Sequence, residues 1–389
     1  MDHSVYIHIP FCHEICHYCD FAKMYYDQKL ADDYLEALHK EMKLYLDDFK
    51  ISPKTVYIGG GTPTSLTPKQ LEKLFQTIHQ FIHVDAVLEF TIEANPGEFY
   101  EEHVQVMKSY GINRISLGVQ VLDDDYLKEL NRLHTVEDVN RSVNQLQKYD
   151  LNNISMDFIY GLPKQSIEHF NKTLEAALTY DLPHYSSYAL QIEPRTVFYI
   201  RHQQGKLQKV KEEDEAAMYT SLIELMEKNG KKHYEISNFS EVGFESKHNL
   251  TYWNNEPYYA FGAGAHGYLN DVRYGNVRPV NHYIKAIEAN NKPVLNIEKL
   301  TLKEKIEEEM FLGLRKMDGV NDRTFQQKYS FSFYDIYKKE IQQLKEKGFI
   351  HDTGTSIQLT ENGMLFGNDV FSSFLLDDDV VKEVLEIDS

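Results

Sequence analysis

The sequence contains few cysteines and no long apolar stretch. Only three cysteines occur in 389 residues, and all lie between positions 12 and 19, so disulfide bonds cannot hold the fold together. No run of about 18 apolar residues, such as a membrane helix needs, is found. The N-terminal segment lacks the basic and long apolar regions of a secretory signal. We therefore expect a globular, cytoplasmic protein whose clustered thiols bind a metal.

Positive charge is also scarce. The chain carries 41 Lys and Arg residues against 60 Asp and Glu residues, and its net charge is −19. Such a charge repels phosphate backbones and anionic lipids unless a local basic patch overrides it. We therefore do not expect nucleic acid as a partner.

Short segments typical of β-strands recur along the first half of the chain, each followed by a longer stretch. There are six of them, at residues 5–9, 55–58, 88–94, 114–118, 153–159 and 185–190. Amphipathic helices are expected in between, at 31–49, 69–81, 136–149 and 167–179. This alternation predicts an α/β fold with a parallel sheet. Six units indicate a curved partial (β/α)6 barrel that is open on one side.

The rest of the chain divides into two further regions. We expect the barrel to span residues 1–210, and residues 211–300 to close its open side over a substrate site. A third region at 301–389 contains three helix-like stretches, a hairpin at 349–359 and a turn at 360–363. It resembles a small winged-helix α+β module, and its surplus of acidic residues argues against DNA binding.

The cysteines form a Cys-x3-Cys-x2-Cys motif directly after the first predicted strand. Cys12, Cys16 and Cys19 supply three thiolates from one loop, whereas a [4Fe–4S] cluster has four irons. One iron is then left open to chelate a small molecule. A zinc site completed by His13 or His17 is the alternative, but structural zinc sites usually take paired ligands from two separated halves.

Polar and glycine-rich residues follow the predicted strands. A Gly-Gly-Gly-Thr-Pro segment at 59–63 follows the second strand, and Glu93, Gln120 and Asp157 lie in or after the next three. In parallel α/β folds, functional residues lie at the carboxyl ends of the strands. Each residue alone has an ordinary alternative as a turn, a cap or a surface charge. Together they predict a site at this end of the barrel.

The segments around these residues resemble a known family. Residues 6–12, 19–21 and 59–63 are similar to radical S-adenosylmethionine (SAM) proteins related to oxygen-independent coproporphyrinogen III oxidase. The resemblance extends over nearly the whole chain. It implies a partial (β/α)6 radical SAM barrel, a [4Fe–4S] cluster held by the three cysteines, bound SAM and a tetrapyrrole-sized substrate.

The resemblance also assigns residues to the pocket. The family positions beside the cluster and SAM are matched by Tyr6, Tyr18, Gly60, Gly61, Thr62, Glu93, Gln120, Arg132 and Asp157. Among these, Gly60 and Gly61 would allow the backbone to approach the amino end of SAM closely. Arg132 would bind the methionyl carboxylate through its bidentate fork.

Two features decide which branch of the family the chain resembles. The oxidase branch has a fourth cysteine two residues after the third, but here Cys19 is followed by Asp20 and Phe21. This ending is typical of the haem-chaperone branch, as is the His-Asn-x-x-Tyr-Trp motif at 248–253. The resemblance implies haem binding and transfer to acceptor haem proteins. The alternatives are oxidative decarboxylation of coproporphyrinogen III and a radical SAM reaction on another substrate.

The same motif contains a candidate haem ligand. His248 would supply an imidazole to haem iron and Trp253 a flat apolar face, with a buried structural pair as the alternative. The role of His266, within the small-residue segment 261–268, stays open between SAM and haem. The other expected partners are an electron donor for the cluster and acceptors that include membrane-associated ones, and the oligomeric state is not predicted.

Overall fold

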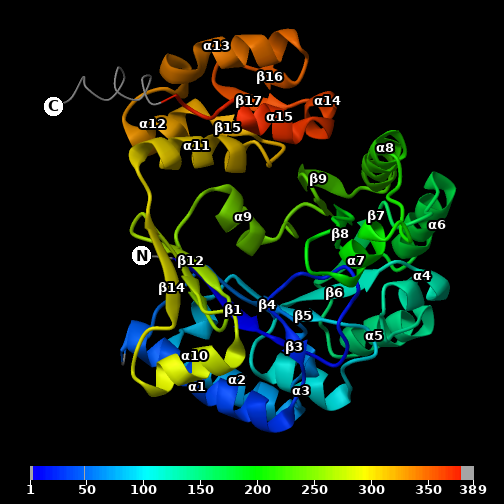
Figure 1. The fold of residues 1–389 in the computed structure, drawn as a ribbon, viewed down its shortest axis with the longest axis vertical. Coiled ribbons are helices and arrows are strands. Elements are labelled where there is room, and N and C mark those ends of the chain that lie inside the picture. Colours follow the sequence, from blue (N-terminus) through cyan, green and yellow to red (C-terminus); the bar gives the residue numbers. More distant parts are fainter. Residues whose placement is uncertain (1–2, 48, 378–389) are drawn as a thin grey trace.

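One large sheet organises most of the computed structural model, which describes residues 3–47 and 49–377 (Figure 1). The sheet has 12 strands in the order β14-β13-β12-β11-β1-β4-β5-β6-β7-β8-β10-β9. Six parallel strands form its centre: β1 (Ser4–Ile9), β4 (Thr55–Gly60), β5 (Glu89–Ala94), β6 (Arg114–Gln120), β7 (Ile154–Tyr160) and β8 (His184–Ala189). The six predicted strands and the α/β class are confirmed.

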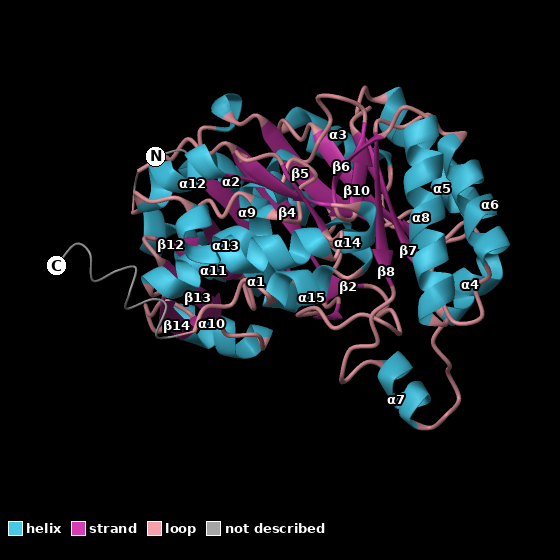
Figure 2. Ribbon diagram, turned by 90° about the horizontal axis from the view of Figure 1, so that it is seen from above, coloured by secondary structure: helices cyan, strands magenta, loops and turns pink. Residues whose placement is uncertain are grey.

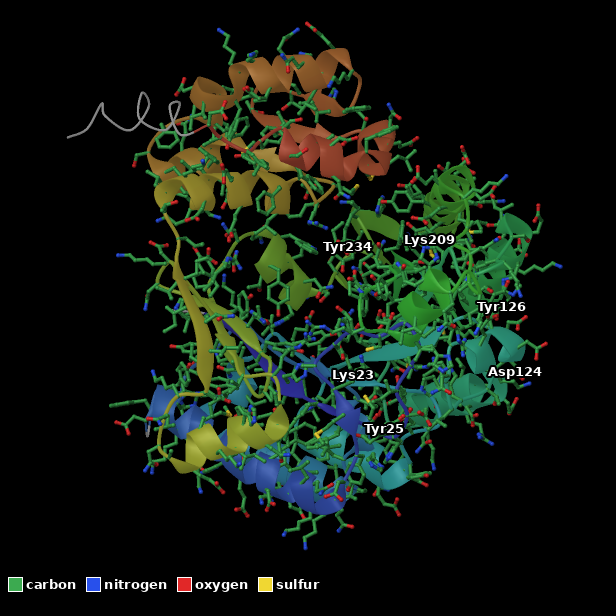
Figure 3. The ribbon with its side chains drawn as sticks, viewed as in Figure 1. Lys23, Tyr25, Asp124, Tyr126, Lys209 and Tyr234 are labelled. Carbon is green, nitrogen blue, oxygen red and sulfur yellow. The ribbon has the colours of Figure 1, made fainter. Side chains whose placement is uncertain are left out.

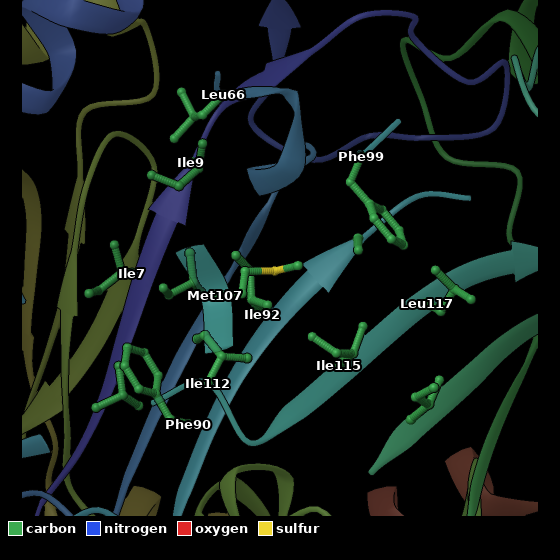
Figure 4. Packing of buried hydrophobic residues seen from close by; sticks show 14 of the residues in the cluster. Ile7, Ile9, Leu66, Phe90, Ile92, Phe99, Met107, Ile112, Ile115 and Leu117 are labelled. Atoms are coloured by element: carbon green, nitrogen blue, oxygen red, sulfur yellow. The ribbon is translucent and has the colours of Figure 1, made fainter. Parts of the chain in front are cut away.

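Alternate side chains of the central strands point to opposite faces of the sheet. The residues on the outer face are apolar and buried, and they include Ile7, Ile9, Phe90, Ile92, Ile115 and Leu117 (Figure 4). The residues between them face the concave side and are mostly polar, such as Thr91, Glu93 and Ser116. This division puts the hydrophobic core outside the sheet and leaves a polar interior.

Helices cover the outer face of the sheet. They are α1 (Gln28–Leu46), α2 (Pro68–Phe81), α3 (Glu101–Ser109), α5 (Val136–Lys148), α6 (Ile167–Leu178) and α8 (Glu212–Lys228). In α5, Thr135 and Asp138 form a capping box, and Val139, Val143 and Leu146 recur on the buried face. The predicted helices agree with the observed ones apart from a few residues at their ends.

The strands after residue 230 extend the sheet at both ends. β9 (Lys232–Glu235) and β10 (Asn238–Ser240) extend the sheet beyond β8. β11 (Tyr258–Phe261), β12 (His266–Leu269), β13 (Val272–Asn276) and β14 (Val294–Lys299) extend it beyond β1. These strands therefore cover the hydrogen-bonding edges that β1 and β8 would otherwise expose. The closing of the barrel's open side by residues 211–300 stays a prediction. In this region, the short helix α9 (Lys247–Trp253) lies on the concave side, against Thr55 and Tyr57.

Several short elements surround the cysteine loop. β2 (Phe11–Cys12) and β3 (Met24–Tyr25) pair in parallel across it. α4 (Asp124–Glu129) precedes the loop that carries Arg132, and α7 (Val197–Gln203) stands out from the body of the molecule in Figure 2. α7 is joined to the cysteine loop because the N–H of Phe198 donates to the carbonyl of His17, at 3.0 Å. α10 (Val280–Glu288) packs against α1.

The C-terminal residues form a module with a core of its own. It contains α11 (Leu302–Gly313), α12 (Asp322–Tyr329), α13 (Phe333–Glu346), α14 (Glu361–Leu365) and α15 (Gly367–Ser372). β15 (Val320–Asn321), β16 (Ile350–Asp352) and β17 (Ser356–Leu359) form a small antiparallel sheet, and the β16–β17 hairpin is confirmed. Phe325, Tyr337 and Ile357 are buried in this core.

Two predictions about boundaries have different outcomes. The predicted turn at 360–363 is wrong, because Thr360 accepts the N–H of Gly363 and thereby caps α14. The large sheet takes strands from both sides of residue 210, and the domain limits at 210 and 300 stay predictions. None of the described helices is long and apolar enough to cross a membrane.

Candidate functional site

The three cysteines lie at the carboxyl end of β1 and line one cavity of about 460 Å³. Cys12 is buried, and Cys16 and Cys19 are half-buried. The loop is anchored to the segment after α4, where the N–H of His17 donates to the carbonyl of Leu130, at 3.0 Å. Lys23, labelled in Figure 3, lines both this cavity and an adjoining surface hollow that contains Arg195 and Arg278.

The arrangement of the thiols suits a cluster better than a single metal ion. Within residues 3–47 and 49–377, no three His, Cys, Asp or Glu side chains gather closely enough to hold one ion. A cubane binds each thiolate through a different iron, so its ligands are more widely spaced. The zinc alternative is not supported, because neither His13, which packs against Tyr26, nor His17, whose Nδ1 donates to the carbonyl of Glu129 at 2.8 Å, joins two of the cysteines in such a group within the described residues.

The glycine segment after β4 lies directly against this loop. A Cβ atom on Gly61 would lie 2.9 Å from Cys12 Sγ and 2.7 Å from the carbonyl oxygen of Phe11, so the position requires glycine. Thr62 Oγ1 lies 3.6 Å from Cys12 Sγ. Burial raises the pKa of the Cys12 thiol to about 12, so a bound iron would be needed to hold it as a thiolate.

Two buried carboxyl groups lie on the concave face beside the glycine segment. Glu93 accepts the hydroxyl of Tyr57 at 2.8 Å and the N–H of Gly60 at 3.0 Å, and burial raises its pKa to about 7. Asp157 accepts the hydroxyls of Ser116 and Ser155 at 2.7 and 2.8 Å, and burial raises its pKa too. Cavity carboxyl groups with shifted pKa values are typical of functional sites, and their oxygens suit ammonium and hydroxyl groups.

A bulge at the end of β6 brings Gln120 into the cavity. The pairing with β7 shifts between Gly118 and Gln120, and Gln120 has φ of 69°, a conformation that is uncommon for residues other than glycine. Arg132 lies next to this bulge. Its Nη2 donates to Asn95 Oδ1 at 2.7 Å and to the carbonyl of Gly118 at 2.5 Å.

The cavity thus brings together all but two of the predicted site residues. Its lining includes Cys12, Cys16, Tyr18, Cys19, Gly60, Gly61, Thr62, Glu93, Gln120, Arg132 and Asp157. Tyr6 does not line it, and its hydroxyl lies 3.0 Å from His8 Nδ1 while its ring stacks on Tyr57. His248 is the second exception.

His248 lies in α9, on the inner side of the strands, and is 1% exposed. Its Nδ1 is 2.7 Å from Thr55 Oγ1, and its Nε2 is 2.8 Å from the hydroxyl of Tyr252. Neither nitrogen is free for iron in this arrangement, and the assignment of His248 to haem stays a prediction. Trp253 is covered on one face by Arg315, whose guanidinium lies 5.2 Å from its ring. His266 is exposed at the start of β12.

Sequence reasoning missed several residues that line the cavity. Tyr57, Arg114, Ser186 and Asn249 belong to this group. Tyr57, Arg114 and Ser186 could have been found from the two-residue period of the strands. In β6, for example, Arg114, Ser116 and Gly118 share one face. Asn249 had no such signal, since α9 reaches the cavity only through the tertiary fold.

Comparison with known proteins agrees with this geometry. The Radical SAM superfamily model matches residues 6–177, and the HemN C-terminal domain model matches residues 300–366. The chain is 45% identical to heme chaperone HemW of Bacillus subtilis over 96% of this chain and 99% of that protein. It is 44% identical to heme chaperone HemW of Lactococcus lactis, over 96% and 98% of the two chains.

A solved structure shows the same fold. Coproporphyrinogen III oxidase (HemN) from Escherichia coli, described as a radical SAM enzyme, superposes with a TM-score of 0.84. The match covers 96% of this chain and 90% of that chain at 22% sequence identity. At this identity the similarity establishes the radical SAM type of fold and leaves the activity undecided.

Proposed function

The chain belongs to the HemW family of radical SAM proteins, and from this premise we propose that it is a haem chaperone that binds haem and transfers it to acceptor haem proteins. Identity of 45% to a heme chaperone over 96% of the chain carries the proposal. Membership of the radical SAM proteins implies a [4Fe–4S] cluster and SAM. The absence of a fourth cysteine after Cys19 supports the chaperone over the oxidase.

The residues around the cavity would divide the work of holding the two cofactors. Cys12, Cys16 and Cys19 would bind three irons of the cluster, which when loaded leaves one iron for SAM and supplies an electron to its sulfonium. Glu93 would bind the amino group of SAM, and Arg132, beside Cys16, its carboxylate. Because Gly61 packs tightly against Cys12 and has no side chain, it leaves room where the cluster and SAM would meet.

The further partners follow from the same proposal. An electron donor must reach the cluster, and a surface hollow that includes Cys19, with Lys23, Arg195 and Arg278 around it, offers one approach. The haem acceptors, membrane-associated ones included, receive haem from a protein that we place in the cytoplasm.

Haem binding and transfer test the function directly. The full chain, reconstituted anaerobically with iron, sulfide and SAM, is titrated with haem and followed by its Soret band. It is then mixed with an apo-form haem acceptor whose own Soret band differs. We expect saturable haem binding and transfer to the acceptor that is faster than from free haem. Absence of saturable binding would reject the proposal.

A parallel assay tests the oxidase alternative, which the shared fold with HemN brings forward. The same preparation is incubated with coproporphyrinogen III, SAM and a reductant, and protoporphyrinogen IX is measured after oxidation to the porphyrin. We expect no product above a control in which Cys12, Cys16 and Cys19 are all replaced by Ala. Product formation that requires the intact cluster would replace the chaperone assignment by the oxidase.

A further inference from the structure

Arg114 is a buried cation in the interior of the barrel that has no hydrogen-bond partner among residues 3–47 and 49–377. It is the first residue of β6, is 2% exposed and lines the cavity. Its buried Nε has no partner, and among the described residues no hydrogen bond or ion pair engages its guanidinium. A buried guanidinium has five N–H donors, and leaving them unpaired costs free energy. Such a side chain is prepared for a ligand.

The acidic side chains nearest to Arg114 are already engaged elsewhere. Glu89 compensates its charge through space, but its oxygens accept the N–H groups of Lys247 and His248 at 2.7 and 3.0 Å. Asp157 is engaged by two serine hydroxyls. These acids therefore neutralise part of the positive charge without occupying the donors of the guanidinium.

The surroundings also favour an incoming anion more than the number of acids suggests. Burial raises the pKa of Glu93 to about 7, so negative charge on this group is reduced near neutral pH, and burial raises the pKa of Asp157 too. Asn249 and Tyr188 line the same cavity and offer an amide and a hydroxyl as further polar partners. A planar carboxylate matches the fork of a guanidinium through two parallel hydrogen bonds.

Arg114 is well separated from the predicted place of the SAM carboxylate. Arg132 contacts the carbonyl of Gly118, which is four residues further along β6. At a strand rise of about 3.3 Å per residue, the backbone positions of Arg114 and Gly118 are about 13 Å apart along β6. The two cations therefore serve different depths of one cavity, with Arg132 beside the cysteines and Arg114 on the floor.

We propose that Arg114 forms a carboxylate-binding subsite on the floor of the cavity and that it takes a propionate of the tetrapyrrole. The inference rests on the proposed haem-binding function, since it names how haem is recognised. The carboxylate of SAM has the same chemistry, so the test must separate the two sources.

The experiment compares haem with haem dimethyl ester, in which both propionates are esterified. Affinities of the reconstituted full chain for both ligands are measured from the Soret band, for wild type, Arg114→Gln and Arg114→Lys. Arg141→Gln is the matched control, because Arg141 is an exposed arginine of α5 that pairs with Asp138. Binding of SAM to each variant is measured in the absence of haem.

We expect wild type and Arg141→Gln to bind haem about tenfold or more tightly than the ester, as one charge-assisted pair allows. Arg114→Gln should lose most of this preference through weaker haem binding, with ester and SAM affinities unchanged. Arg114→Lys should keep part of the preference for haem over the ester. If Arg114→Gln does not fold, the affinities of Arg114→Lys test the subsite.

Three results would overturn the inference. An undiminished preference in the Arg114 variants would leave the guanidinium without a role in propionate binding. A loss of SAM affinity with the preference intact would assign the subsite to the methionyl carboxylate instead. Absence of haem binding by wild type would reject both the subsite and the haem-chaperone function, whereas the first two results leave that function standing.

Discussion

Nη1 of Arg132 lies 3.3 Å from Sγ of Cys16. One side chain therefore contacts a predicted ligand of the cluster and lies at the predicted place of SAM. A guanidinium in this position can donate to the thiolate and to a ligand carboxylate at the same time, because its donors point in several directions. The two cofactors should consequently respond together to a change at this residue.

Replacement of Arg132 by Ala should weaken SAM binding about tenfold or more, because a charge-assisted contact is lost. The cluster should still assemble, since no thiolate is removed. Its reduction potential should fall, because a hydrogen bond to a ligand sulfur is lost. Equilibrium binding of SAM and a redox titration measure the two effects, with Arg141→Ala as the control. Wild-type SAM affinity and potential together would contradict both roles.

Replacement of Gly61 by Ala should reduce the amount of [4Fe–4S] cluster, because the new Cβ would lie 2.9 Å from Cys12 Sγ. The backbone carbonyl of Phe11 is closer still, at 2.7 Å, and cannot move without displacing the loop. The iron and sulfide contents and the visible absorption are compared with those of Gly367→Ala. A Cβ at Gly367 meets its nearest neighbour at 3.4 Å, so this variant should load fully. Full loading of Gly61→Ala would refute the packing argument.

The parts of the fold that follow from local patterns were predictable. The alternation of β1, β4, β5, β6, β7 and β8 with helices lies in the sequence itself, and so does the cysteine spacing. The pairing of β11 with β1 was not predictable, because it joins Ser4 to Tyr258 across most of the chain. Arg114 was predicted as the start of a strand, and only the tertiary fold shows that its buried Nε has no partner in the part of the chain that the structure describes.

Glu41 is a buried carboxyl group that the amphipathic pattern of α1 did not predict. It is 0% exposed and accepts the N–H of Gly262, the amide of Asn276 and the hydroxyl of Tyr283, at 2.7, 2.6 and 2.6 Å. The three donors come from the small-residue segment and the elements after it. Glu41 therefore joins α1 to the segment after β11, to β13 and to α10.

The pKa of Glu41 makes the stability of the protein depend on pH. Burial raises this pKa to about 7, whereas the unfolded chain has a value of about 4.3. Between these values the folded state holds a proton that the unfolded state has released. This contribution to the free energy of unfolding is therefore full below pH 4.3 and is lost as the pH rises to about 7, at up to about 1.4 kcal/mol per pH unit.

Glu41→Gln should remove this part of the pH dependence, because glutamine does not titrate. Urea unfolding of the apo-protein from pH 5 to pH 8 should show that the variant gains stability relative to wild type as the pH rises. Glu36→Gln is the control, since Glu36 is an exposed residue of the same helix. Parallel curves for wild type and Glu41→Gln would show that Glu41 is ionised in the folded protein.

The hydrogen bonds of His248 bear on whether this residue is structural or is an axial ligand of haem iron. Thr55 Oγ1 donates to Ser4 Oγ, so it accepts the proton on Nδ1 of His248, and Nε2 then accepts from Tyr252. Burial lowers the pKa of the imidazole to about 3, and the ring is therefore neutral. The lone pair that iron would need is occupied by the Tyr252 hydroxyl in this arrangement.

We therefore expect His248→Ala to lower the free energy of unfolding by about 1–3 kcal/mol, because it leaves buried hydroxyl groups without partners. The Soret band of the haem-loaded variant should match wild type, as should that of His83→Ala, an exposed control. Tyr252→Phe sharpens the comparison, because it frees Nε2 without removing the ring. A Soret shift in His248→Ala at unchanged stability, with tighter haem binding in Tyr252→Phe, would instead support the axial ligand predicted from the sequence.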